Sequence, residues 1–363
     1  MISPWNYPFY LPLLSATQAL SAGCTVIIKP SRVTPLSGQL IQTLAEEAGL
    51  PEGVVQVIHA DRAAATALVE GDTDIIAFTG SSEAGRKIGA LAAGLLKPVL
   101  LELGGKDAQI VLEDANIKHA AKGAVTFGCF NAGQMCVGIE RVYVVDSVYD
   151  EFMAEAQKAI EKLTVATGDK SDIGPMIAPE QADIIERHVN EAVERGARII
   201  SGGSRVETEH GVYFEPTLME NVDHSMALMQ DETFGPVVPV MRVADADEAL
   251  RLANDSPFGL HGSVWTKNRR KGAAVASRMK TGNVAVNDHV INFFFPSIKF
   301  SGIGESGLHG QLGEEGIKAF TIHRSITSAH LQPTTKLMRA WLPRTVRPGY
   351  WIALAKTLFA WRR

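Results

Sequence analysis

Strand-like and helix-like segments alternate through residues 1–105, and this alternation limits the fold more than any other feature of the sequence. Short apolar runs such as 25–28 and 99–103 are separated by stretches that begin or end at Pro or Gly. Strands and helices that alternate in this way need crossover connections, which place the strands parallel in one sheet. The expected strands are 25–28, 54–58, 74–78 and 99–103, and the expected helices are 34–48, 63–69 and 82–96. The first of these helices has Thr34 as its capping residue and Pro35 at its first position.

The alternation resumes after Asp114 and predicts a second α/β unit. Its expected helices are 115–127, 149–163, 179–195, 245–254, 268–280 and 314–320, and its expected strands are 141–145, 197–201, 236–243, 263–266, 283–287 and 321–327. Asp245 is expected to cap the helix that follows it. Residues 300–310 are rich in Gly and Ser and predict a long loop.

Composition excludes several classes of protein. A net charge of −5 and a pI near 6.1 give no global attraction to nucleic acid. The count of three cysteines argues against a disulfide framework and favours a reducing, cytoplasmic setting. No basic and apolar leader stands at the N-terminus, and the histidines show no metal-ligand spacing, so neither a signal peptide nor a metal site is expected.

The segment 127–141 is typical of a loop that presents a single thiol. Gly133 and Gly138 flank Cys136 and permit backbone conformations and close approaches that other residues resist. Most lone cysteines are packing residues, so catalysis by Cys136 requires partner residues elsewhere in the chain.

Charged and glycine-rich residues follow the expected strands of the first unit, where parallel sheets bind ligands. Lys29, Ser31 and Arg32 follow one strand. Gly80, Ser81 and Gly85 lie between a strand and a helix, a place where backbone N–H groups favour phosphate. The spacing is neither GxGxxG nor a P-loop, and an ordinary strand-to-helix turn remains the alternative.

Seven segments in this order resemble the aldehyde dehydrogenase superfamily. They are Pro-Trp-Asn-Tyr-Pro at 4–8, Lys-Pro-Ser at 29–31, Phe-Thr-Gly-Ser at 78–81, Glu-Leu-Gly-Gly-Lys at 102–106, Gly-Gln-Met-Cys at 133–136, Glu-Thr-Phe-Gly-Pro at 232–236 and Ser-Gly-Ile-Gly at 301–304. The resemblance covers residues 4 to 327 and implies a Rossmann-like cofactor domain joined to a second, catalytic α/β domain. The implied divisions are 1–105, 106–303, 304–330 with an oligomerisation strand, and a C-terminal extension at 331–363.

The resemblance also implies a role for each matching residue. Cys136 is the nucleophile, Asn6 stabilises the oxyanion, and Glu102 activates the water that hydrolyses the thioester. Lys29, Ser31, Arg32, Gly80, Ser81, Gly85, Glu232 and Phe234 bind NAD or NADP. The implied reaction oxidises an aldehyde to a carboxylic acid in a homo-oligomer.

The chain departs from the family pattern in three places. Family members carry further residues before the Pro-Trp-Asn segment, so we expect the N-terminal part of the cofactor domain to be missing. Arg32 stands where NAD-preferring members carry glutamate, which favours acceptance of NADP. Leu11, Phe130 and Phe295 suggest an apolar substrate pocket, and Leu14 replaces an arginine that is typical of members acting on carboxylated semialdehydes.

Two alternatives accompany this interpretation: a coenzyme A-acylating enzyme, which Glu102 disfavours, and an inactive shortened paralogue that serves as an assembly partner. The apolar and basic tail 350–363 has two possible positions, a membrane interface or the surface of its own or a neighbouring subunit. We favour the second position.

Overall fold

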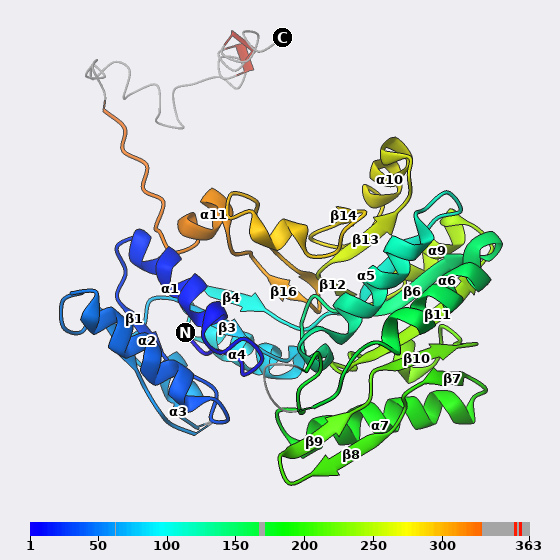
Figure 1. Cartoon of the computed structure of the whole chain (residues 1–363). Coiled ribbons are helices and arrows are strands. Elements are labelled where there is room, and N and C mark those ends of the chain that lie inside the picture. The colour runs from blue at the N-terminus through cyan, green and yellow to red at the C-terminus, as the bar shows by residue number, and fades with distance from the viewer. Residues whose placement is uncertain (62, 167–170, 329–351, 354–355, 358–363) are drawn as a thin grey trace. The chain divides into compact units, whose positions relative to one another are not determined.

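The computed structural model describes residues 1–61, 63–166, 171–328, 352–353 and 356–357. The chain divides into two compact units, Met1–Thr321 and Ile322–Arg363 (Figure 1). All the site residues discussed below belong to the first unit. In the second, residues 322–328 have no regular secondary structure, and 352–353 and 356–357 are helical, with Thr357 Oγ1 donating to Ala353 O. Most of the extension expected at 331–363 lies outside the described residues.

Parallel strands of the first unit form the expected cofactor sheet. β1 (Val26–Ile28) pairs with β2 (Val55–Val57), and β3 (Ile76–Thr79) pairs with β4 (Val99–Glu102). Ile2 joins the two pairs, because it forms parallel bridges to both Lys29 and Phe78. The helices between these strands are α2 (Pro35–Glu47), α3 (Ala63–Glu70) and α4 (Ser82–Gly94). The alternation read from the sequence is therefore confirmed.

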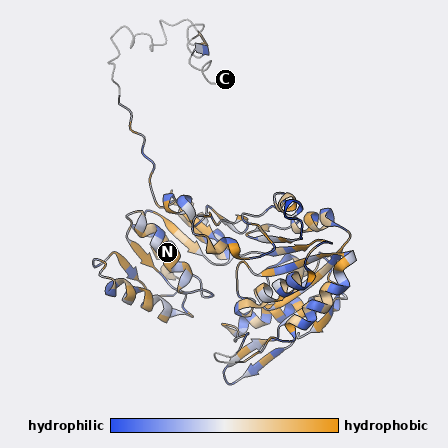
Figure 2. Cartoon of the chain, turned by 45° about the horizontal axis from the view of Figure 1, so that its top comes forward, coloured by the Kyte–Doolittle hydropathy of each residue, from blue (hydrophilic) through white to orange (hydrophobic). Residues whose placement is uncertain are grey.

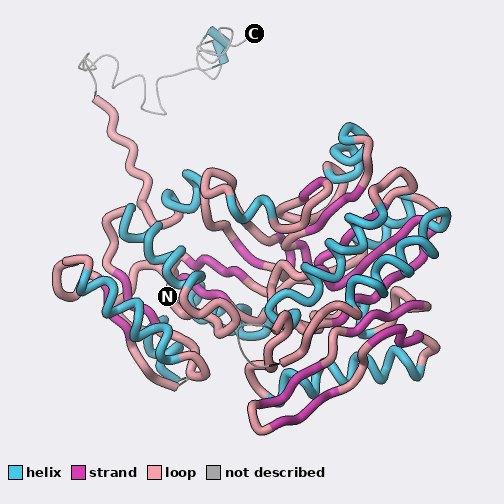
Figure 3. Tube along the Cα trace, in the orientation of Figure 1, coloured by secondary structure: helices cyan, strands magenta, loops and turns pink. Residues whose placement is uncertain are grey.

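A seven-stranded sheet forms the second half, in the order β14-β13-β5-β6-β11-β10-β7. Figure 3 shows strands in magenta with helices in cyan around them. The strands of this sheet are β5 (Asp107–Val111), β6 (Ile139–Val145), β7 (Arg198–Ser201), β10 (Thr217–Glu220), β11 (Val237–Val243), β13 (Gly262–Trp265) and β14 (Ala285–Val286). All neighbours in it are parallel except β7 and β10. Parallel strands are covered on both faces, and β6 is accordingly buried along its whole length.

Helices of mixed polarity cover this sheet (Figure 2). They are α5 (Ile117–Cys129), α6 (Asp146–Ile160), α7 (Pro179–Glu194), α8 (Ala227–Gln230), α9 (Ala246–Ala253) and α10 (Arg269–Ala276). β6 and β11 pack against α5 and α6, and β5 and β6 pack against α9. The buried face of each helix joins one large apolar cluster with the strands. A short hairpin of β8 (Arg205–Thr208) and β9 (Gly211–Phe214) lies beside α7.

Helix starts follow the expected capping chemistry at one of two positions. Asp245 accepts the backbone N–H groups of Asp247 and Glu248, so its predicted cap is confirmed. Thr34 occupies the cap position of α2, but its side chain makes no capping hydrogen bond, so that prediction is wrong. Its backbone there, with φ −133° and ψ 50°, lies outside the extended region typical of capping residues. Pro35 at the first helical position confirms the other part of the prediction.

The structure corrects three further expectations. Helix α1 (Tyr10–Ser21) was not predicted, because Pro12 is an apparent breaker, although proline is tolerated in a first turn. The expected loop at 300–310 contains β15 (Ile303–Gly304) and β16 (Gly307–Leu308), which pair with β12 (Phe258–Gly259) and β4. No strand is assigned at 321–327 within the single chain: α11 (Gly313–Lys318) ends nearby, and residues 322–328 pair with none of the described strands. Pairing of this segment with a neighbouring subunit, as an oligomerisation strand requires, stays a prediction. Apolar alternation alone does not make a strand without a pairing partner.

Among the described residues, no strand pairing joins the cofactor sheet to the seven-stranded sheet. The chain passes from one sheet to the other between the end of β4 at Glu102 and the start of β5 at Asp107. We propose that the division of Met1–Thr321 into a cofactor part and a catalytic part falls at this crossing, near residue 106. Within the described part of the chain, no helix has both the length and the apolar content that crossing a bilayer requires.

Candidate active site

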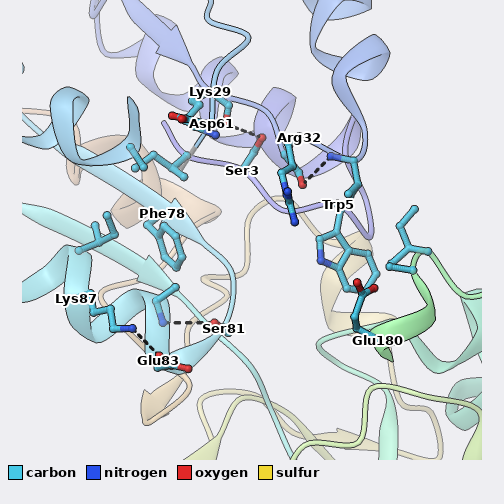
Figure 4. A pocket seen from close by; sticks show the side chains of 18 of the residues that line it. Ser3, Trp5, Lys29, Arg32, Asp61, Phe78, Ser81, Glu83, Lys87 and Glu180 are labelled. Atoms are coloured by element: carbon cyan, nitrogen blue, oxygen red, sulfur yellow. Dashed lines mark hydrogen bonds and ion pairs between the residues drawn. The ribbon is translucent and has the colours of Figure 1, made fainter. Parts of the chain in front are cut away.

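Two adjoining cavities make a cleft between the ends of the two sheets. The larger, about 720 Å³, is lined by Lys29, Ser31 and Arg32, among others (Figure 4). The smaller, about 280 Å³, is lined by Asn6, Cys136 and Glu232, among others. Four residues line both cavities: Trp5, Ser81, Gln181 and Ile184. The cleft therefore runs from the lysine after β1 to the thiol in the second half.

The loop that carries Cys136, residues 130–138, is here called the nucleophile loop. It leaves α5 through a turn in which Asn131, Ala132 and Gly133 all have positive φ. A Cβ on Gly133 would lie 2.0 Å from the carbonyl carbon of Gly235, so only glycine fits this crossing. Gly138 does not have positive φ, but a Cβ there would approach Met135 O at 3.0 Å. Gly133 therefore meets both needs foreseen for the flanking glycines, and Gly138 meets only the need for close approach.

Cys136 sits among carboxyl groups. Burial raises the pKa of its thiol well above the ordinary value, and Glu102, Asp107 and Glu232 raise it further. The backbone N–H of Val137 works in the opposite direction. The thiol therefore carries its proton in this structure, and attack on an electrophile requires a nearby acceptor for that proton.

Asn6 lines the same cavity as Cys136, and its amide is held by the nucleophile loop. Its Nδ2 donates to Gln134 O at 3.2 Å, which fixes the amide in the loop that carries Cys136. Asn131 Nδ2 donates to Asn6 O at 3.2 Å and anchors the backbone. One amide hydrogen of Asn6 is used in the hydrogen bond to Gln134. The second is available to a ligand in the cavity that Asn6 and Cys136 line.

Glu102 is the last residue of β4 and is 5% exposed. Burial raises the pKa of its carboxyl well above the ordinary range. Its Oε1 makes no hydrogen bond to any described residue, whereas its backbone is fixed by pairing with Thr79 and Gly307. A raised pKa means that this carboxyl, once ionised, is a stronger base than an exposed glutamate, which is the property that a proton acceptor needs.

Glu232 closes the cleft from the second half. Its Oε1 accepts the Gly105 N–H at 2.8 Å. Burial first, and Glu140 second, raise the pKa of Glu232 to about 8, against the opposing effects of the Gly105 N–H and Lys106. A Cβ on Gly104 would lie 2.5 Å from Glu232 Oε2, so a larger residue there would displace this carboxyl from its present position.

Phe234 stands in the same cavity with a positive φ of 52°. Its ring meets the Trp5 ring edge to face at 5.4 Å. Because Trp5 comes from the first half of the molecule, this contact joins the two walls of the cleft.

A buried ion pair that the sequence analysis missed supports this wall. Lys106 Nζ lies 2.5 Å from Glu140 Oε2, and both residues are buried. Glu140 also accepts the N–H groups of Thr233 and Phe234 at 2.8 Å each. The same carboxylate thus connects the strand that follows the nucleophile loop to the 232–236 segment. The sequence offered one clue: two charged residues, Glu140 and Arg141, inside an otherwise apolar strand.

Replacing Lys106 with methionine is expected to lower the free energy of unfolding by about 3–5 kcal/mol, because the Glu140 carboxylate would remain buried without its cation. Urea unfolding followed by circular dichroism measures the change. The matched control is Lys158→Met, whose exposed pair with Glu155 is expected to contribute less than about 1 kcal/mol. A loss for Lys106→Met no larger than that of the control would show that the buried pair does not support the site.

At the other end of the cleft, the Lys29 side chain is buried. Among the described residues, its Nζ makes one hydrogen bond, to Pro30 O at 3.4 Å. Burial lowers the pKa of Lys29, and Asp61 partly offsets the effect. Arg32 is exposed in the same cavity, and Ser31 Oγ accepts the Val33 N–H. Figure 4 shows Lys29 close to Asp61 and Ser3, with Arg32 near Trp5.

The turn after β3 has a different role at each candidate position. Ser81 caps α4 by accepting the Ala84 N–H and lines both cavities. Gly80 lines the smaller cavity, and its N–H donates to Glu102 O. Gly85 is buried, and a Cβ there would lie 2.4 Å from Leu103, so this glycine allows close packing of α4 on the chain after β4.

Of the three residues expected to line a substrate pocket, one lines the cavity that contains Cys136 and two do not. Leu11 on α1 is buried and lines the cavity that contains Cys136. Phe130 and Phe295 are 54% and 48% exposed and lie outside the residues lining the two cavities. Cys136 packs on an apolar cluster that includes Tyr7 and Phe293. Neither of these two residues was among those predicted to line the pocket.

Comparison with known proteins gives consistent results. A sequence model described as the aldehyde dehydrogenase family matches residues 1–326. The chain is 39% identical to the 4,4'-diapolycopene aldehyde oxidase of a Methylomonas species, over 88% of this chain and 60% of that protein. It is 41% identical to the benzaldehyde dehydrogenase YfmT of Bacillus subtilis, over 91% of this chain and 68% of that protein. The chain therefore spans between three fifths and seven tenths of the length of these relatives.

Solved structures agree on the fold. The Mycobacterium tuberculosis aldehyde dehydrogenase complexed with NAD+ superposes with a TM-score of 0.85 and 38% identity. The match covers 88% of this chain and 66% of that one. The expected α/β fold is confirmed by this likeness.

Proposed function

The chain belongs to the aldehyde dehydrogenase family, and from this premise we propose that it oxidises an aldehyde to a carboxylic acid with NAD or NADP. The observation that carries the proposal is the meeting of Asn6 and Cys136 in one cavity, with the charge of Glu102 acting on the thiol. Those are an oxyanion donor, a nucleophile and a proton acceptor, the groups that this chemistry needs.

Residues along the cleft have the chemistry to hold a nicotinamide dinucleotide. Lys29 and the N-terminus of α4 at Ser81 offer positive charge and N–H donors toward ribose and phosphate. Glu232, at the thiol end, offers a carboxylate that accepts ribose hydroxyls, and Phe234 offers an aromatic surface. The bound cofactor would supply the acceptor for a hydride.

In the proposed reaction, the Cys136 sulfur forms a bond to the aldehyde carbon and the thiol proton passes to a nearby carboxylate, for which Glu102 is placed. The carbonyl electrons become an oxyanion, which accepts hydrogen bonds from Asn6 Nδ2 and the Cys136 N–H. Loss of hydride leaves a thioester on Cys136. Once Glu102 has passed the thiol proton to solvent, it takes a proton from the water that attacks this thioester. The S–C bond breaks, the leaving sulfur recovers that proton from Glu102 as a thiol, and the acid is released.

The substrate is proposed to be an apolar or aromatic aldehyde. Leu11 lines the cavity of Cys136, and Tyr7 and Phe293 pack in the same apolar cluster as the thiol. The two relatives reported above are named for 4,4'-diapolycopene aldehyde and for benzaldehyde.

The function is tested by incubating the purified chain with a panel of aromatic, aliphatic and carboxylated aldehydes and each cofactor. Reduced cofactor is followed by absorbance and the carboxylic acid by chromatography. We expect equal amounts of the two products, with benzaldehyde turned over faster than succinate semialdehyde. No turnover with any aldehyde by a correctly folded chain would contradict the proposal.

We propose that Arg32 admits the 2′-phosphate of NADP, because it lines the larger cavity and no carboxylate stands at that position. Replacing Arg32 with glutamate is expected to raise the ratio of kcat/KM for NAD to that for NADP by about 10- to 100-fold, from loss of a charge-assisted contact and added repulsion. The matched control is Arg270→Glu on the exposed start of α10. An unchanged ratio in Arg32→Glu would refute the assignment.

A further inference from the structure

Three ligand-type side chains meet in the interior beside the nucleophile loop, although the sequence gave no metal motif. Asp107 begins β5, His261 immediately precedes β13, and His289 lies in the loop after β14. They are 2%, 1% and 0% exposed. One candidate ligand atom from each lies within 4.8 Å of the other two. The pairing of β5, β13 and β14 as neighbours brings together residues that lie far apart in the sequence.

This cluster contains an unusual concentration of unsatisfied polar atoms. Asp107 Oδ1 accepts the His261 backbone N–H at 3.0 Å, but Asp107 Oδ2 has no hydrogen-bond partner among the described residues. The same holds for both ring nitrogens of His261 and for Nε2 of His289. Buried polar atoms nearly always find a partner, so four such atoms at one place indicate a missing occupant.

The His289 ring is held by a partner outside the cluster. His289 Nδ1 lies 2.9 Å from Ser263 Oγ, which also accepts the Trp265 Nε1–H at 3.1 Å. In the tautomer with its proton on Nδ1, His289 donates to this hydroxyl and leaves the Nε2 lone pair free, the outer-shell arrangement that metal-binding histidines commonly show.

We propose that Asp107, His261 and His289 bind a divalent transition-metal ion, with zinc as the best match, between β5, β13 and the loop after β14. Two nitrogens and one oxygen suit zinc and its neighbours in the first transition row, whereas magnesium and calcium favour oxygen alone. One positive ion would satisfy the unpaired atoms and compensate the charge of the buried carboxylate together.

The distances are compatible with such an ion after small side-chain rotations. Asp107 Oδ2 lies 3.8 Å from His289 Nε2. Zinc bonds of about 2.0–2.2 Å in a tetrahedral site place ligand atoms about 3.4 Å apart. This pair therefore needs to close by only a few tenths of an ångström, whereas a pair at the 4.8 Å limit of the cluster needs to close by about 1.4 Å. The His261 ring nitrogens make no hydrogen bond to a described residue, and the Gly262 backbone is the group that acts on this ring.

The ion's position assigns it a supporting role. The backbone of Val137, next to Cys136, lies near enough to the His289 ring to raise its pKa, although His289 Nε2 makes no hydrogen bond to it. None of the three ligand residues lines the two cavities of the cleft. The ion would therefore hold the nucleophile loop in place from within the core, and its ligands are positioning residues.

The test uses the untagged chain carrying Cys136→Ala, so that neither a histidine tag nor the cavity thiol binds the metal. Zinc bound after dialysis is measured by elemental analysis, the unfolding temperature is recorded with and without zinc, and cobalt(II) is added as a spectroscopic probe. We expect stoichiometric zinc, an unfolding temperature that rises with zinc concentration, and visible d–d bands with cobalt. None of these readouts depends on enzyme activity.

Variants locate the site. His261→Asn and His289→Asn are expected to weaken zinc binding by at least about 100-fold, and Ser263→Ala, which removes only the outer partner, by about 10- to 100-fold. The matched control is His224→Asn, which removes a histidine bound to Tyr143 outside the cluster and is expected to bind zinc normally. The proposal is overturned if the parent chain takes up no metal, which would leave buried water as the occupant, or if folded His261 and Ser263 variants bind zinc as tightly as the control.

Discussion

Serine at position 136 in place of cysteine is expected to lower kcat for aldehyde oxidation by about 10⁴-fold or more, because it removes the nucleophile on which every later step depends. A hydroxyl is a much weaker nucleophile than a thiol, and the carboxyl groups around Cys136 further oppose formation of an anion there. Steady-state formation of reduced cofactor, with equal concentrations of folded protein, measures the loss.

The control is Cys24→Ser, because Cys24 is also partly buried, donates its thiol hydrogen to the Phe320 carbonyl and lines neither cavity of the cleft. It is expected to retain activity within about twofold, in line with a surface-type substitution of less than 0.5 kcal/mol. Activity of Cys136→Ser within tenfold of the parent chain would rule out the thiol as nucleophile.

Glutamine at position 102 is expected to separate the two halves of the reaction. Its amide has the shape of the carboxyl but cannot accept the proton of the attacking water, so steady-state turnover should fall by about 10²- to 10⁴-fold. The thioester should then accumulate on Cys136. Rapid mixing should show an initial burst of reduced cofactor, and mass spectrometry of the quenched chain should show the acyl group on the peptide that contains Cys136.

The outcome also distinguishes the acylating alternative. If the chain hands its acyl group to coenzyme A, Glu102→Gln should turn over normally when coenzyme A is present. If Glu102→Gln loses both the burst and the steady-state turnover, Glu102 acts in the first half of the reaction, as the acceptor of the thiol proton. Glu52→Gln, an exposed carboxyl on the loop before β2, is the control and should leave both phases unchanged.

The fold was largely predictable where local chemistry and burial agree. The first three helices between strands, the cap at Asp245 and the long buried strand β6 all show patterns that need no knowledge of distant residues. The prediction failed where a partner far along the chain decides. β16 forms because β4 offers an edge to Gly307, and Ile2 pairs as a strand residue because it fits between Lys29 and Phe78.

The site shows the same limit. Cys136, Asn6 and Glu232 were named from motif resemblance, and all three line one cavity, whereas Glu102 is buried at the end of β4 and lines neither cavity of the cleft. The Lys106–Glu140 pair was missed, because 34 residues separate the two and only the neighbouring strands β5 and β6 bring them together. The Asp107, His261 and His289 cluster was missed for the same reason. Its spacing of 154 residues between Asp107 and His261 corresponds to no ligand motif.

The backbone crossing at Gly133 has a consequence for how such a catalyst can change. The backbones at Gly133 and Gly235 pack directly against each other, with no room for a side chain at Gly133. The segment that carries Cys136 is therefore fixed in position relative to the segment that carries Phe234. In the proposed reaction, the main-chain geometry at this contact therefore sets the alignment of the Cys136 thiol with the cofactor. Aldehyde preference can drift through substitutions such as those at Leu11 without disturbing that alignment. Any substitution at Gly133 itself would spoil it for every aldehyde alike.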